Sequence, residues 1–126
     1  KDYAAVLPQA PADLARGHRL IGYIPDLIYA PELHYLDEIH PGLTAHLRSS
    51  SINAQHRLIA AGAGIGVLPC FMGDNDTALT RVLPDCVITR TLWLVTHRDT
   101  QGLSRVKAGK DWLVGITQSK GRYLLA

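Results

Sequence analysis

Hydrophobic and polar positions alternate along the chain with periods that predict short strands and short helices in turn. Residues 43–48 alternate strictly, with Leu43, Ala45 and Leu47 on one face, which predicts a strand. Apolar runs predict further strands at 3–7, 19–24, 64–69 and 90–97. Spacings of three and four predict helices at 31–39, 52–61 and 104–118, and one or two helical turns at 11–17. This order predicts an α/β fold with a largely parallel sheet, in which the continuous TLWLV of the last strand is buried on both faces.

The glycine-rich stretch AAGAGIGVLP at residues 60–69 resembles a phosphate-binding loop at first sight. A dinucleotide-binding loop follows a strand and opens a helix, whereas here the predicted helix comes first and the strand second. Val67 also stands where the third glycine would be, and no P-loop lysine follows. We therefore expect Gly62 to end the preceding helix in the left-handed conformation, and Gly64 and Gly66 to allow close backbone approach.

Composition and charge restrict the class of protein. A chain of 126 residues is about one domain long, and its net charge of +2 comes from scattered Lys and Arg, so a nucleic-acid surface within it is not expected. No apolar run is long enough to span a bilayer, and no secretory signal is recognisable. Cys70 and Cys86 are expected to be buried thiols in a reducing cytoplasm, with a disulfide as the open alternative. Because the chain begins at Lys1 and not at Met, we expect a fragment of a longer protein.

Candidate catalytic and metal-binding residues do not form a recognisable set. His34, His40 and His46 recur every six residues, a spacing that matches no helical face and no zinc signature. The serines at 49–51 lack a nucleophile-elbow context. We therefore expect no metal, no cofactor and no enzymatic activity.

The serine run does predict a binding feature. Ser50 or Ser51 can cap the helix expected at 52–61, and with Asn53 they place hydroxyl, amide and free backbone N–H groups at one point. The positive end of a helix dipole at the carboxyl end of a strand favours a small carboxylate. Capping alone is the alternative for each of these residues.

Several segments, in this order and spacing, resemble the C-terminal part of LysR-type transcriptional regulators over nearly the whole chain. They are ADLARGHRLIGY at 12–23, LRSSSINAQHRLIAAGAGIGVLPCFMGD at 47–74, LTRVLPD at 79–85, TLWLVTHRD at 91–99 and RVKAGKDWLVG at 105–115. The resemblance implies an effector-binding domain with a periplasmic-binding-protein-like type 2 fold. Residues 1–96 would form mainly its second lobe, and residues 97–126 would return to the first lobe.

The resemblance also implies a function. The chain would sense a small anionic effector for a cytoplasmic, homo-oligomeric (dimeric or tetrameric) regulator, with DNA bound by a helix-turn-helix domain absent from these residues. The helix 52–61 and the strand 43–48 resemble the elements through which such domains pair. The effector would contact residues from the serine run and from the following strand: Ser50, Ser51, Ile52, Asn53, Gly66, Val67, Leu68 and Pro69. The alternative is a solute-binding protein of a transport system with the same lobed fold.

Overall fold

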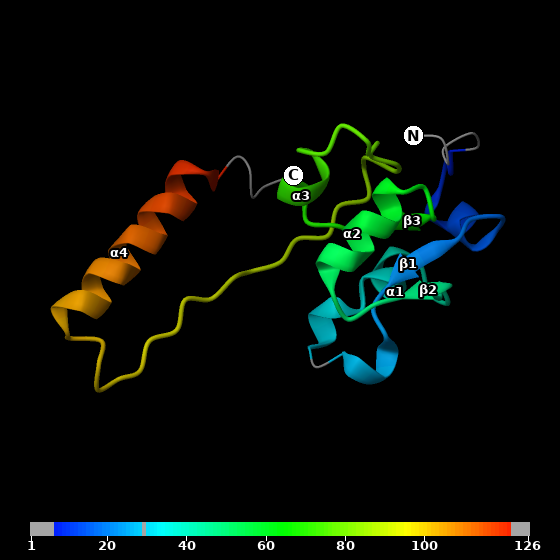
Figure 1. Cartoon of the computed structure of the whole chain (residues 1–126). Coiled ribbons are helices and arrows are strands. Elements are labelled where there is room, and N and C mark those ends of the chain that lie inside the picture. Colours follow the sequence, from blue (N-terminus) through cyan, green and yellow to red (C-terminus); the bar gives the residue numbers. More distant parts are fainter. Residues whose placement is uncertain (1–6, 29, 122–126) are drawn as a thin grey trace. The chain divides into compact units, whose positions relative to one another are not determined.

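A computed structural model describes residues 7–28 and 30–121 of the chain (Figure 1). The chain divides into two compact units, Lys1–Ile88 and Thr89–Ala126, which are described separately. The strand expected at 3–7 lies outside the described residues, except for Leu7.

The first unit is built on a three-stranded parallel sheet with the order β2-β1-β3. β1 (Leu20–Gly22) lies in the centre, flanked by β2 (Leu47–Arg48) and β3 (Ile65–Gly66). Ile21 is paired with Leu47 on one side and with Gly66 on the other. The prediction of a parallel α/β sheet is confirmed, although each strand is shorter than its apolar run.

The α-helices of the chain are α1 (Tyr35–Ile39), α2 (Ile52–Ala60), α3 (Cys70–Gly73) and α4 (Ser104–Ser119), of which α1 lies between β1 and β2 and α2 between β2 and β3. Short 3₁₀ helices form at η2 (Pro11–Ala15), η3 (Pro25–Leu27) and η4 (Pro31–Leu33). The helix expected at 31–39 is thus divided at His34 into η4 and α1. The helices expected at 52–61 and 104–118 form almost as predicted, whereas α3 was not predicted.

α1 and α2 cover opposite faces of the sheet. A Cβ at Gly22 would contact Leu36 of α1, whereas a Cβ at Gly66 would meet Ile59 of α2. Gly66 shares its face with its register partner Ile21, and Ile21 points away from Gly22 because side chains alternate along a strand. Beneath α1, Leu14, Leu20 and Leu43 form a buried cluster.

The glycine-rich stretch ends α2 as expected. Gly62 has a φ of +75°, its N–H donates to the carbonyl of Ile59, and the N–H of Ala63 donates to the carbonyl of Leu58. These two hydrogen bonds are those of a Schellman motif, in which a glycine adopts the left-handed conformation just after a helix. Gly62 is therefore structural, as the order of helix and strand indicated.

The strand expected at 90–97 does not form. Residues 88–97 carry no regular secondary structure (Figure 1). Leu92 and Trp93 are 82% and 84% exposed. Strand propensity resides in the segment itself, but a strand also needs a partner with unpaired N–H and C=O groups. In the described residues the sheet consists only of strands between Leu20 and Gly66. The predicted burial of TLWLV on both faces is therefore wrong.

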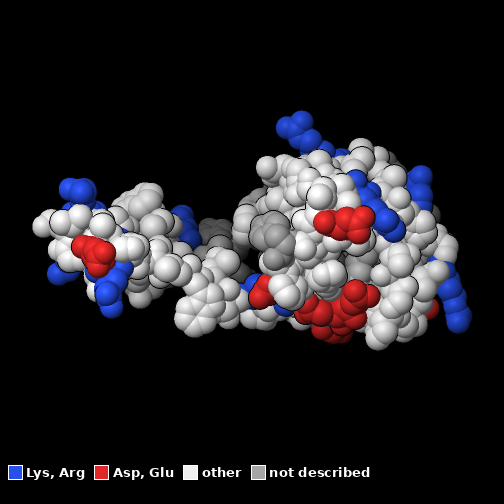
Figure 2. All heavy atoms as spheres, turned by 90° about the horizontal axis from the view of Figure 1, so that it is seen from below, with Lys and Arg blue, Asp and Glu red and all other residues white. Residues whose placement is uncertain are grey.

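The surface of the first unit differs in part from expectation. Cys70 is only half-buried and Cys86 is exposed, so the prediction of two buried thiols is wrong, and the two are not bonded to each other. On the face that Figure 2 shows, Lys and Arg of this unit are spread over the surface and form no continuous basic patch, while Asp and Glu form separate patches, the largest of them at the lower edge of the view. This distribution is not that of a surface for nucleic acid.

Candidate functional site

The carboxyl ends of all three strands meet at one edge of the sheet, because the strands are parallel. Tyr23 follows β1, Ser49 follows β2, and Val67 follows β3. In open parallel sheets this edge is where ligands bind. It is therefore the candidate functional site of the first unit.

The serine run fixes the start of α2 at this edge. The Ser51 hydroxyl accepts a hydrogen bond from the N–H of Ala54 at 3.4 Å, as an N-cap does. The Ser49 hydroxyl accepts from the N–H of Ser51 at 3.1 Å. Ser50 and Asn53 are exposed, and no side-chain partner reaches them from the described part of the chain. Of the two expected caps, the structure thus uses Ser51.

The eight residues expected at the effector site fall into two groups. Ser50, Ser51, Ile52 and Asn53 run from the connection after β2 into the first turn of α2, and Gly66, Val67, Leu68 and Pro69 run from the last residue of β3 to the start of α3. Both groups lie at the same sheet edge, but β1 separates them. With strands spaced by about 4.8 Å, the two groups are roughly 10 Å apart across the sheet. Tyr23, which follows β1 between them, was not predicted.

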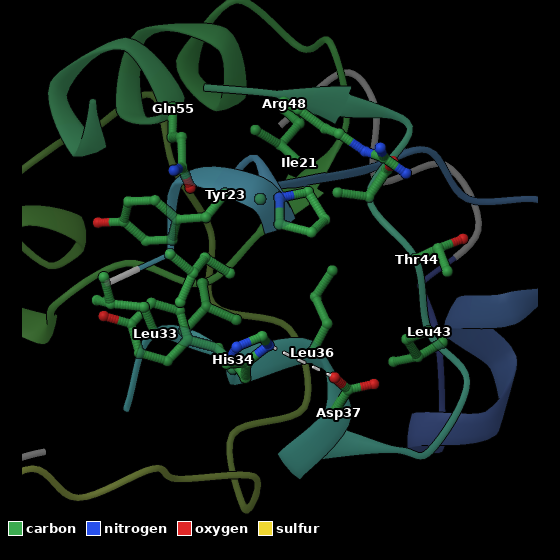
Figure 3. Close-up of a pocket in the computed structure, with 16 residues that line it drawn as sticks. Ile21, Tyr23, Leu33, His34, Leu36, Asp37, Leu43, Thr44, Arg48 and Gln55 are labelled. Carbon is green, nitrogen blue, oxygen red and sulfur yellow. Dashed lines mark hydrogen bonds and ion pairs between the residues drawn. The ribbon is translucent and has the colours of Figure 1, made fainter. Parts of the chain in front are cut away.

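A hollow of about 230 Å³ opens beside this edge (Figure 3). Its lining comes from β1 and the following turn, from α1 and the segment after it, from β2, from α2, and from Val67. Most of the wall is apolar, while the polar side chains that line it include those of Tyr23, Asp37, Thr44, Arg48 and Gln55. Of the eight expected site residues, only Val67 lines it.

Sequence reasoning missed the two polar side chains that flank the serine run, Arg48 and Gln55. Gln55 is 1% exposed, and its Nε2 donates to the carbonyl of Ser49 at 2.9 Å. Arg48 donates through Nε to the carbonyl of Ala45 at 3.0 Å. A signal for Gln55 was present, because it shares a helix face with Ile52 and Ile59 and is polar where the pattern calls for an apolar residue.

Other polar contacts hold the segment after α3. His56 Nε2 on α2 lies 2.9 Å from Asp76 Oδ2, though outside hydrogen-bond geometry. Arg81 donates to both carboxylate oxygens of Asp74, and this hydrogen bond raises the pKa of the guanidinium above its ordinary value. Among the described residues, no group of His, Cys, Asp and Glu is arranged to hold a metal ion.

Replacing the cap tests the local geometry. Ser51→Ala removes the acceptor for the Ala54 N–H, so we expect a loss of about 1 kcal/mol in the free energy of unfolding. Ser50→Ala is the matched control and should leave stability within about 0.5 kcal/mol of wild type, because its side chain is exposed. Urea unfolding followed by circular dichroism measures both. Equal losses for the two variants would contradict the assignment of the cap.

A parallel sheet covered by helices on both faces, with a helix N-terminus and a hollow at the strand ends, is the architecture of an α/β ligand-binding domain. The protein-family model of the LysR substrate binding domain matches residues 1–116 of the sequence, so the chain belongs to that family. No curated protein and no solved structure matches the chain significantly.

Family membership confirms the resemblance seen in the sequence. Domains of this family sense small-molecule effectors in LysR-type transcription regulators, are generally not enzymes, and have a periplasmic-binding-protein-like type 2 fold. Within the described residues, no helix has the length and apolar character needed to cross a membrane.

Proposed function

We propose that this chain is the part of a LysR-type regulator that binds a small anionic effector at the carboxyl edge of the sheet. The start of α2 is the observation that carries the proposal. Ile52 and Asn53, in the first helical turn, have backbone N–H groups without intrahelical acceptors, and the helix dipole adds positive potential there. The Ser50 hydroxyl and the Asn53 amide lie exposed beside them.

The second wall of this site is formed by Gly66, Val67, Leu68 and Pro69. These residues are half-buried and mostly apolar, so they suit the hydrocarbon part of an effector while Ser50, Ser51, Ile52 and Asn53 receive its carboxylate. β1 and Tyr23 lie between the two groups. An effector that bridges them must therefore extend across the end of β1.

Residues 1–96 would supply mainly the second lobe of the domain, and residues 97–126 would return to the first. The division of the chain into compact units near residue 88 supports a boundary in this region. An effector that binds one arrangement of the lobes more tightly would shift the population toward it. In a dimer or tetramer paired through residues 43–48 and α2, this shift would change the spacing of the DNA-reading helices of a separate helix-turn-helix domain.

Binding of anions provides the test. We expect small carboxylates such as succinate and benzoate to raise the melting temperature of the chain, whereas the corresponding amides should not. Ser50→Trp should abolish this response, because a large ring would cover the first turn of α2, while Arg57→Gln on the same helix should keep it. An equal response in Ser50→Trp and wild type would refute the site.

A solute-binding protein of a transport system is the second candidate, because the lobed fold is shared. The coding sequence upstream of Lys1 distinguishes the two. A helix-turn-helix followed by a long helix supports the regulator, whereas a signal peptide there supports transport.

A further inference from the structure

We propose that His46 is a pH-sensitive switch in the first unit: its neutral imidazole completes the pairing of β1 with the segment before β2, and a proton on the ring breaks that pairing. The proposal stands on two hydrogen bonds between His46 and Leu20. It does not depend on the function proposed above, because it concerns the first residue of β1 and not the carboxyl edge of the sheet.

His46 binds both backbone groups of Leu20. The His46 N–H donates to the Leu20 carbonyl at 2.8 Å, and the Leu20 N–H donates to Nδ1 of the His46 ring at 3.1 Å. His46 lies at a bend directly before β2, where regular strand pairing has not yet begun. The imidazole therefore accepts a hydrogen bond that a backbone carbonyl of the neighbouring strand accepts in a regular ladder.

The direction of the second hydrogen bond fixes the protonation state of the ring. A backbone N–H can only donate, so Nδ1 must offer a lone pair, and the single ring proton of a neutral imidazole is then on Nε2. An imidazolium carries a proton on both nitrogens and would set two N–H groups against each other. Because Leu20 is only 2% exposed, its N–H would lose its acceptor where water hardly reaches it. His46 itself is exposed, so protons from solvent reach the ring.

The charges around His46 give an imidazolium no compensation. Titratable and charged groups stand on every element near this end of the sheet: His18 and Arg19 before β1, Arg48 in β2, Asp13 and Arg16 at η2, Tyr35, Asp37 and Glu38 on α1, His56 and Arg57 on α2, and Arg81 and Asp85 beside Leu83. Within the described part of the chain, no carboxylate forms an ion pair with His46. The charged residues closest to the Leu20–His46 pair along the chain, Arg19 and Arg48, are both cations. A proton on His46 therefore breaks a hydrogen bond and forms no ion pair in exchange.

The sign of the pH dependence follows from these contacts. The unfolded chain accepts a proton at His46 that the folded chain excludes, so the folded state loses stability as the pH falls through the range of about 8 to 5 in which histidine ordinarily titrates. Linkage limits one group to a tenfold change in the folding equilibrium constant per pH unit. We expect His46 to lower this constant about tenfold between about pH 7.5 and 5.5. His34 beside Asp37 and His56 beside Asp76 act in the opposite direction, because an imidazolium there gains a carboxylate.

His46→Asn tests the proposal in the full chain. The Oδ1 of asparagine is bonded to Cγ as Nδ1 is in histidine, so it can accept the Leu20 N–H, but the amide does not titrate. Urea unfolding at about pH 7.5 and 5.5 gives the fall in the folding equilibrium constant, which we expect to be about tenfold larger for wild type than for this variant. His34→Asn is the matched control, because it removes an exposed imidazole that faces a carboxylate. It should make the wild-type fall larger, by less than about threefold.

Spectra of the wild-type chain test the same contact without any substitution. At about pH 7.5, long-range ¹H–¹⁵N correlation of the His46 ring should show a proton on Nε2 and none on Nδ1. The Leu20 amide, compared with its intrinsic exchange rate, should be less protected from solvent at about pH 5.5 than at 7.5. A proton on Nδ1 at the higher pH, equal protection of Leu20 at both pH values, or an equal fall in stability for wild type and His46→Asn would each overturn the proposal.

Discussion

Gly64→Ala is expected to unfold most of the first unit. A Cβ at this position would collide with the carbonyl oxygen and carbon of Arg19, both of which are backbone atoms that no side-chain rotation can move aside. The same carbonyl accepts the N–H of Ile65 at 2.9 Å, so relief of the collision would break the pairing of β1 with β3. We expect a loss of about 3 kcal/mol or more, which is a large part of the stability of a small domain.

The matched control for this substitution is Gly73→Ala. Gly73 is the last residue of α3, and a Cβ there would have open space around it. Because alanine favours helix over glycine, this variant should be neutral or slightly stabilised. Urea unfolding followed by far-UV circular dichroism compares the two. A midpoint for Gly64→Ala within error of the wild-type value would contradict the close approach of the two backbones.

Leu20→Ala is expected to have the next largest effect. Leu20 is 2% exposed and lies in the cluster formed with Leu14 and Leu43, which is the main apolar core of the unit. Truncation of a buried leucine leaves a cavity and costs about 2–5 kcal/mol. Leu92→Ala makes the same chemical change at an exposed position and should cost less than about 0.5 kcal/mol.

Thermal and urea unfolding of these two leucine variants decide the point. Where Leu20→Ala is too unstable to show a folded baseline, Leu20→Val provides a smaller truncation at the same site. Equal stability of Leu20→Ala and Leu92→Ala would show that the cluster beneath α1 does not hold the fold together.

Most of the first unit could be predicted from its sequence because local signals and tertiary environment agree there. The alternation of Leu43 with exposed Thr44 survives in the structure, and so does the helix stop at Gly62. The prediction of a strand at 90–97 was wrong because strand formation depends on a partner strand, which the local sequence does not encode. In β1 the apolar pattern predicts a strand and two partner strands are present, whereas TLWLV has the apolar pattern but no partner strand among the described residues.

The candidate site was predictable only in part, for the same reason. Ser51 could be identified because a cap acts within its own helix. The hollow could not, because it forms where segments around Tyr23, Leu36, Arg48 and Gln55 meet, and no sequence spacing encodes their meeting. A polar residue on an apolar helix face, such as Gln55, is the one local sign of it.

The central place of β1 has a consequence for how the chain folds during synthesis. β1 is the first of the three strands to be made, yet Ile21 pairs with Leu47 and Leu20 with Ile65, so its partners follow about 26 and 45 residues later. At a synthesis rate of about 5–20 residues per second, Leu20 would wait roughly 2–9 seconds for Ile65. No hairpin can nucleate this sheet, and its two ladders must close long loops. Of the three strands, β1 is thus the one that remains unpaired for longest during synthesis.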